Sequence, residues 1–217
     1  MGFILYLQQR ISIYTLVIIS QMKHFEKIQT LLPFGYLYLV ILGIIKETAF
    51  FYQLDINILK YSSIMDVLIS PIATLTSNPF VFIIITIILV LCFNLPAFLF
   101  KNDHKNWVQK IFELKKTKTE LGEDEIKNNY LFISIKFLAF FLLSIYLGYG
   151  IGEGYTISKR IKNNKLKYEY KLNYTTGESE VVSLLETNSL YYFYVEKGKP
   201  IVKIAPIGGI KNIEIIH

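Results

Sequence analysis

The stretch FVFIIITIILVLCFNLPAFLF, residues 80–100, is apolar along its whole length except for Thr86 and Asn94. About 20 helical residues cross the hydrocarbon core of a bilayer, and this stretch has that length. An Asn-Pro pair marks its start, and Pro96 predicts a kink or an end near its exit. We therefore predict a transmembrane helix over residues 80–100.

Two further apolar runs, residues 31–51 and 130–150, have the same character. Lys136 interrupts the second, near enough to its start for the ammonium to reach lipid headgroups. Hydrophobic residues make up 53% of the chain and charged residues 18%. The mean hydropathy of +0.40 is too apolar for an ordinary soluble domain. We predict an α+β membrane protein with about three transmembrane helices in a membrane domain of residues 31–154.

The N-terminal segment, residues 1–30, reads differently. Arg10 divides its apolar stretch into pieces too short to span a bilayer, and no signal-peptide cleavage site follows. Two interpretations stay open: the segment is translated, or it lies upstream of a true start at Met22. A chain beginning at Met22 would place Lys23 and Lys27 as a basic flank before the first span.

Lys46 and Glu47 stand side by side near the end of the first span and form a candidate polar pair in the membrane. A rise of about 1.5 Å per residue places them nearer the far interface than the midplane. Adjacent helical residues point about 100° apart, so we expect no simple ion pair within the helix. We predict that Lys46 anchors the helix at the interface and that Glu47 is the better suited to a function, with a paired ion site as the alternative.

Two connecting segments carry short amphipathic patterns. Residues 64–75 include Pro71, and Ser63 with Asp66 three residues later has the form of a capping box at the beginning of this segment. This length predicts an interfacial or re-entrant helix and not a crossing. The loop between the second and third spans carries an apolar stripe that predicts a solvated amphipathic elbow. The stripe consists of Trp107, Val108, Ile111, Phe112 and Leu114.

Glycines alternate in GYGIGEGY, residues 148–155. A phosphate-binding loop needs a strand before it, but here an apolar helix precedes the glycines, which disfavours nucleotide binding. Ser144, Gly148 and Gly152 instead recur at a spacing of four. Such a stripe of small residues is typical of close packing between membrane helices.

From Lys165 onward, apolar and polar residues alternate with a period of two, which predicts a half-buried strand. Further strand-like runs cover residues 180–185, 190–196, 201–205 and 210–216. We predict a small all-β domain at residues 155–217, a five-strand barrel-like or rolled sheet. So short a domain buries little core, so we expect it to lean on the helices or on another copy.

Three tyrosines in one of these strands, Tyr191, Tyr192 and Tyr194, form a candidate interaction surface. Core and interfacial packing of the rings is the alternative interpretation.

Lysine and arginine counts beside the spans predict the orientation, because cytoplasmic loops carry an excess of both. The loop between the second and third spans holds Lys101, Lys105, Lys110, Lys115, Lys116, Lys118 and Lys127. The segment after the third span holds Lys159, Arg160, Lys162, Lys165 and Lys167. The larger group predicts that the N-terminus and the loop are cytoplasmic and that the β domain is periplasmic, at a bacterial inner membrane.

Several functional classes find no support. His24, His104 and His217 lie far apart and Cys92 stands alone, so we expect no metal site, disulfide or cofactor. No catalytic motif appears, which predicts a non-enzymatic protein. The net charge of +6 comes without a nucleic-acid-binding module, so lipid headgroups are the expected partners of the lysines.

The layout of a few membrane helices followed by a small β domain resembles uncharacterised bacterial membrane proteins. In layout alone it also resembles the membrane-bound β-barrel effectors of bacterial anti-phage signalling. Our first hypothesis is a membrane-anchored assembly or interaction component that contacts copies of itself or other membrane proteins through the β domain. The alternatives are a ligand-gated membrane effector and a small transporter or channel subunit.

Overall fold

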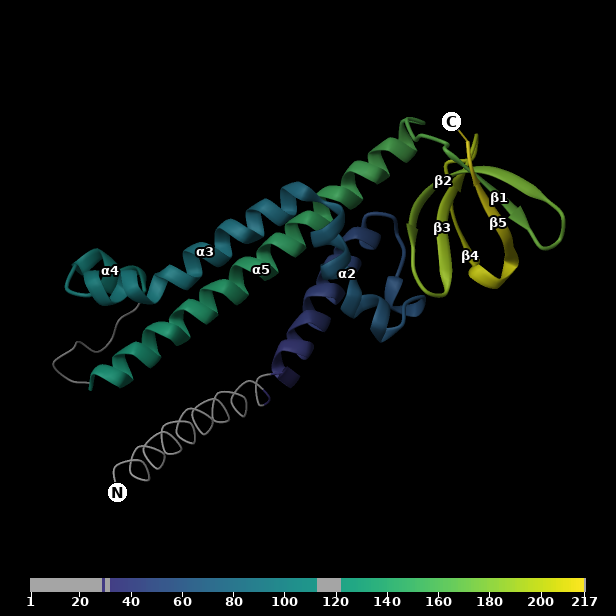
Figure 1. Cartoon of the computed structure of the whole chain (residues 1–217). Helices are drawn as coiled ribbons and strands as arrows, with labels where there is room; N and C mark the ends of the chain where they lie inside the picture. The colour runs from purple at the N-terminus through teal and green to yellow at the C-terminus, as the bar shows by residue number, and fades with distance from the viewer. Residues whose placement is uncertain (1–28, 30–31, 113–121, 217) are drawn as a thin grey trace, which may run out of the picture. The chain divides into compact units, whose positions relative to one another are not determined.

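A computed structural model describes residue 29, residues 32–112 and residues 122–216 (Figure 1). The alternative start at Met22 and its basic flank therefore lie outside the described residues. The chain divides into two compact units, Met1–Ile41 and Leu42–His217. In the first unit, residues 32–41 are helical and mostly exposed. Lys46, Glu47, the helices α2 to α5 and the β-sheet all belong to the second unit.

Among the described residues, three helices are long and apolar enough to cross a membrane, as predicted. They are Leu32–Tyr52, α3 (Pro79–Asn102) and residues Glu125–Lys162 of α5 (Glu123–Lys162). Asn78 caps α3 by accepting hydrogen bonds from the backbone N–H groups of Phe80 and Val81, at 3.1 and 3.3 Å. Pro96 lies inside α3, which continues to Asn102.

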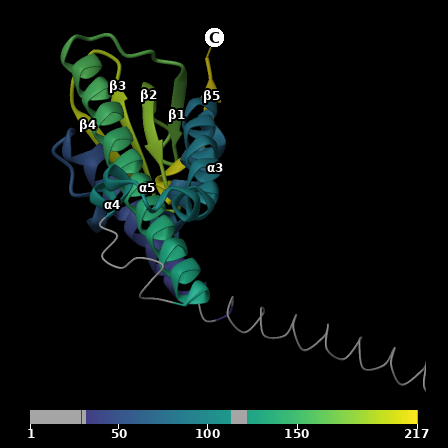
Figure 2. The ribbon, with the colours of Figure 1, turned by 90° about the vertical axis from the view of Figure 1, so that its left-hand side faces the viewer.

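Helices α3 and α5 lie side by side (Figures 1 and 2). Most of their apolar side chains point away from the chain, such as Phe93, which is 81% exposed. Apolar surface of this extent needs lipid or another protein to cover it. Within the chain, Leu99 packs with Val108, Ile126 and Tyr130.

The predicted elbow between the spans contains the short helix α4 (Asn106–Ile111). Val108 is buried, but Trp107 and Ile111 are exposed. Leu114, the last residue of the predicted stripe, lies outside the described residues. The stripe therefore does not pack as one face against the rest of the chain.

Between the first span and α3 lie η1 (Ile58–Lys60) and α2 (Ile64–Ser77). The predicted capping box is confirmed, because Ser63 Oγ accepts from the Asp66 N–H at 3.2 Å and Asp66 Oδ2 accepts from the Ser63 N–H at 2.9 Å. Pro71 lies inside the helix and does not end it. With 14 residues, α2 is shorter than the three candidate spans.

The C-terminal residues form a five-stranded antiparallel sheet in the order β4-β3-β2-β1-β5. Its strands are β1 (Tyr170–Tyr174), β2 (Ser179–Thr187), β3 (Tyr191–Glu196), β4 (Val202–Pro206) and β5 (Ile210–Ile215). The predicted five strands are confirmed, although the first begins at Tyr170 and not near Lys165. The sheet is open, with β4 and β5 as its edges, and does not close into a barrel.

A short connection bends this sheet. Strand β4 ends at Pro206, which pairs with Tyr191 at the start of β3, whereas β5 begins at Ile210, which pairs with Tyr174 at the end of β1. In a flat sheet these two points would lie at opposite ends. Only η2 (Ile207–Gly209) joins them, and the four steps from Pro206 to Ile210 span about 14 Å at most. The sheet is therefore strongly rolled.

Two hydrophobic clusters position the sheet. Leu172, Val182, Tyr194 and Ala205 form its own core. In a second cluster, Phe50 and Phe51 of the first span and Ile58 of η1 pack on Phe193 of β3. The small sheet thus shares its apolar core with the helices.

Candidate functional site

Three glycines bring the helices together around Lys46 and Glu47. A Cβ atom on Gly43 would overlap the Val67 carbonyl of α2, and one on Gly154 would overlap the Phe50 carbonyl. A Cβ atom on Gly150 would lie 2.5 Å from the Lys46 carbonyl oxygen. Since only glycine permits these backbone contacts, the end of the first span packs closely between α2 and α5.

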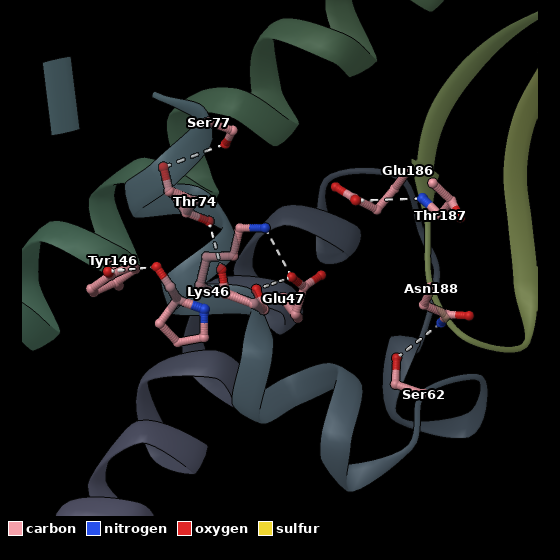
Figure 3. A network of polar contacts seen from close by, with 11 residues as sticks. Lys46, Glu47, Ser62, Thr74, Ser77, Tyr146, Glu186, Thr187 and Asn188 are labelled. Atoms are coloured by element: carbon pink, nitrogen blue, oxygen red, sulfur yellow. Dashed lines mark hydrogen bonds and ion pairs between the residues drawn. The ribbon is translucent and has the colours of Figure 1, made fainter. Parts of the chain in front are cut away.

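Pro71 contributes to this packing. It has no backbone N–H, so it cannot donate the helical hydrogen bond to the Val67 carbonyl, and Gly43 lies against that carbonyl. The Pro71 carbonyl in turn accepts a hydrogen bond of 2.9 Å from the Tyr146 hydroxyl of α5. Figure 3 shows the Tyr146 side chain with this hydrogen bond as a dashed line. The irregular turn of α2 is therefore held from two sides.

Lys46 and Glu47 form an ion pair, with 2.8 Å between Lys46 Nζ and Glu47 Oε1. Our expectation that adjacent residues would not pair is wrong. The four-carbon stem of lysine spans the angular gap, and Ser70 of α2 donates a hydrogen bond to the same carboxylate oxygen. Both residues are buried, at 5% and 8% exposed. Lys46 is therefore not extended toward water as an interface anchor would be.

The β2–β3 turn sits on the N-terminus of α2. The Ser189 N–H donates to Asp66 Oδ1 at 3.0 Å, and Ser189 Oγ donates to Asp66 Oδ2 at 2.9 Å. Asn188 Nδ2 donates to the Tyr61 carbonyl at 2.9 Å. Burial alone would raise the pKa of Asp66, but the hydrogen bonds from Ser63 and Ser189 hold it below its usual value. Asp66 thus caps α2 and binds the turn at once.

Glu186 enters the site from β2, where the pairing register with β3 shifts between Leu184 and Glu186. Such irregularities often redirect a side chain beside a functional site. Among the described residues, the one hydrogen bond to its carboxylate comes from the Thr187 N–H, at a long 3.4 Å. Burial raises the pKa of the Glu186 carboxyl; Lys46 opposes this rise and Glu47 adds to it.

These groups surround a cavity of about 160 Å³. Its polar wall includes Lys46, Glu47, Asp66, Ser70, Glu186 and Asn188, and its apolar wall includes Phe51, Ile58, Ile69 and Phe193. Figure 3 shows Glu47 and Glu186 approaching the same space from the first span and from β2. One cation thus faces three carboxylates in this cavity.

The other predicted site residues lie elsewhere. A Cβ atom on Gly148 or Gly152 would have no neighbour within 4 Å. The exposed Ser144 donates to the Phe140 carbonyl of its own helix, at 2.9 Å. The predicted stripe therefore points outward, and the glycines that contact another helix of the chain are the alternate pair. Packing of the stripe against a second copy stays a prediction.

The three tyrosines of β3 lie in different environments. Tyr191 packs edge-on against Tyr61, with ring centroids 5.5 Å apart, and Tyr192 is half-buried. Tyr194 is buried, and its hydroxyl lies 2.6 Å from that of Tyr174. Burial raises the pKa of Tyr194. Within this chain, all three take part in packing of the sheet.

Sequence reasoning missed Ser70, Glu186 and Asn188 as site residues. Asp66 carried a signal, the capping box, but nothing in the pattern linked it to a turn more than a hundred residues later. The described residues contain no group of three His, Cys, Asp or Glu side chains that could hold a metal ion. The arrangement instead offers negatively charged hydrogen-bond acceptors, of which Glu47 is buried and Asp66 and Glu186 are half-buried.

Compared with known proteins, the chain matches no family model, no curated protein and no solved structure.

Proposed function

We propose that this protein is a non-enzymatic integral component of a bacterial inner membrane that assembles with copies of itself or with other membrane proteins. The observation that carries the proposal is the docking of the β2–β3 turn on α2 through Asn188 and Ser189. Together with the Phe193 cluster, this docking makes the sheet part of the helical bundle and not a freely tethered module.

A partner that binds the sheet would act on the membrane helices through a short series of hydrogen bonds. Ser189 binds Asp66 at the start of α2, and Ser70 in the same helix binds Glu47 of the first span. Movement of the turn would therefore shift α2 against the buried ion pair. The exposed apolar side chains of α3 and α5 offer the surface on which lipids and other subunits would pack.

The proposed orientation follows the lysine distribution. If the three candidate spans all cross the bilayer, the segment between α3 and α5 lies on one side of the membrane and the sheet on the other. The lysine-rich segment is proposed to be cytoplasmic and the sheet periplasmic, in agreement with the positive-inside rule.

The test uses two differently tagged full-length copies produced in one cell. We expect the copies to co-purify from solubilised membranes, and Ser189→Ala combined with Asn188→Ala to reduce co-purification several-fold while both copies stay in the membrane fraction. Ser179→Ala, an exposed serine at the other end of β2, is the matched control. If neither copies nor other membrane proteins co-purify with the wild-type chain, the assembly role is wrong.

The second candidate function is a ligand-gated membrane effector. The observation that favours it is the cavity itself, which lies where the sheet, α2 and the first span meet. A ligand there would contact all three elements and so change how they pack. The transporter hypothesis gains no such observation, because Thr86 and Asn94 each bond a backbone carbonyl of their own helix, at 2.8 and 2.7 Å.

A further inference from the structure

We propose that the cavity beside Lys46 and Glu47 is a binding site for a small organic primary ammonium, with Glu47 and Glu186 as its acceptors. The inference deepens the second proposed function and rests on it for the consequence in the membrane. Binding itself can be measured separately.

The charges of the cavity wall do not balance. Lys46 is the cation of the cavity wall, and its ammonium is already paired with Glu47 at 2.8 Å. The Asp66 carboxylate is also satisfied, because Ser63 and Ser189 both donate to it. Glu186 has no ion pair within 4.0 Å among the described residues, so its charge is the one that the protein leaves without close compensation.

The Glu47 carboxylate has hydrogen-bonding capacity that the protein leaves unused. Both hydrogen bonds to Glu47 reach the same oxygen, Oε1. Figure 3 shows the other oxygen pointing toward the side from which Glu186 enters. A carboxylate accepts at both oxygens, so Glu47 and Glu186 together offer acceptors but no donor to this space. A protonated primary amine, with three N–H donors, complements this arrangement.

The size and lining of the cavity define the rest of the ligand. Since one water takes about 30 Å³ of the liquid, a space of about 160 Å³ holds several waters or a molecule of a few heavy atoms. Phe51, Ile58 and Phe193 line its apolar side, where a short alkyl chain would lie. Three carboxylates in the wall would reject an anion of the same size. The predicted class is therefore a short alkylammonium.

The test is a calorimetric titration of the full-length chain in detergent micelles at neutral pH, with propylammonium chloride as the probe. A ligand of four heavy atoms reaches tens of micromolar at best, so the titration extends from about 10 µM to 50 mM. We expect saturable binding of propylammonium and none of propanol or propionate. Sodium chloride that competes equally at the same concentration would overturn the choice of an amine.

Two variants locate the site. Glu186→Gln removes the uncompensated charge, and Ala73→Leu, at an exposed position of α2 that lines the cavity, narrows it. We expect each to weaken binding at least about tenfold, as expected for loss of a charged hydrogen bond or of space. Glu169→Gln, an exposed carboxylate outside the cavity wall, is the matched control and should leave binding unchanged. A thermal melt checks that each variant is folded, and Ala73→Leu carries the test if Glu186→Gln does not fold.

The outcomes separate this site from the proposed functions. Unchanged affinity in the folded cavity variants, equal binding of propanol, or no saturable binding to the wild-type chain would overturn the site and leave the assembly role untouched. Binding with the predicted selectivity, but without any change in co-purification of tagged copies, would keep the site and overturn ligand gating.

Discussion

Glu47 and Glu186 face the same cavity in very different states. Glu47 is compensated by Lys46 and by the Ser70 hydroxyl, whereas Glu186 depends on one long bond to a backbone N–H. Removing a carboxylate from water without a close cation disfavours its charged form. At the scale of single residues, Glu186 therefore costs stability at neutral pH, as a group held ready for a ligand would.

This cost predicts a pH dependence. The pKa of Glu186 is raised in the fold, so the folded state holds the proton over a pH range where the unfolded chain has released it. Stability should therefore fall as pH rises above about 4.3, the usual value for glutamate. The charged groups that act on Glu186 are Lys46, Glu47 and Glu153.

We expect the wild-type melting temperature to decrease from about pH 5 to pH 7.5 more steeply than that of Glu186→Gln, because the amide cannot ionise. At pH 7.5 the variant should be the more stable of the two. Thermal unfolding in detergent at several pH values measures both slopes, and Glu169→Gln should follow the wild type. Parallel curves for the wild type and Glu186→Gln would contradict the prediction.

The pKa of Asp66 is shifted in the opposite direction, so its contribution to stability depends on pH in the opposite way. Its pKa is lowered in the fold, so its contribution is present above the usual aspartate value of about 3.9 and is lost as pH falls through the folded value. Asp66→Ala removes the capping box and both bonds to Ser189. We expect a loss of about 1–3 kcal/mol at pH 7.

Denaturant unfolding at pH 7 measures this loss. Ser63→Ala, which removes the cap but leaves the Ser189 bonds, should lose less. Equal losses in the two variants would mean that the hydrogen bonds between Asp66 and the β2–β3 turn add no stability.

At the scale of elements, α5 presents two sets of glycines to two environments. Gly150 and Gly154 lie against the backbone of the first span, and Gly148 and Gly152 face outward. Each set repeats every four residues, and the two sets are offset by two residues, so they lie on different faces of one helix. Substitutions in the two sets therefore test packing within the chain and association between copies separately.

We expect Gly150→Leu to disrupt the fold, because its side chain would collide with the Lys46 carbonyl and Ala49. Gly148→Leu should keep the fold but weaken association between copies by about 1 kcal/mol, roughly fivefold, if the outward stripe packs helices. Limited proteolysis reports the first effect, and crosslinking of tagged copies reports the second. Normal folding of Gly150→Leu would contradict the close contact, and unchanged crosslinking in both Gly148→Leu and Gly152→Leu would exclude the stripe.

Elements with a local cause were predictable from the sequence. Apolar runs of bilayer length gave the three candidate spans, Ser63 and Asp66 gave the start of α2, and Gly177 and Gly198, with φ of 94° and 86°, mark turns between strands. The site was not predictable, because it depends on contacts between residues far apart in sequence. Glu186 meets Lys46 only once the sheet has rolled and docked, and no local pattern encodes that meeting.

At the scale of the whole molecule, the order of the elements along the chain predicts sidedness. The first span, α3 and α5 form three candidate crossings, so α4 and the sheet should lie on opposite sides. Lys110 of α4 and Ser179 of β2 are both exposed. Single cysteines at these positions would therefore be accessible to reagents.

In a Cys92→Ala background, we expect Ser179→Cys, and not Lys110→Cys, to react with a membrane-impermeant maleimide in spheroplasts. Lysed membranes, in which both should react, are the control. Labelling of both positions from one side would refute the pairing of α3 and α5 as successive crossings. Labelling of Lys110→Cys alone would invert the proposed orientation.

The division of the cavity wall between early and late parts of the chain imposes an order on biosynthesis. Lys46, Glu47 and Ser70 are translated before α3, whereas Glu186 and Phe193 leave the ribosome only after α5. Helices enter the bilayer as they emerge, and domains tend to fold in the order of synthesis. The ion pair would thus form while its side toward the sheet is still uncovered, and a newly made chain would pass through a stage in which that side is accessible to chaperones or to a neighbouring chain.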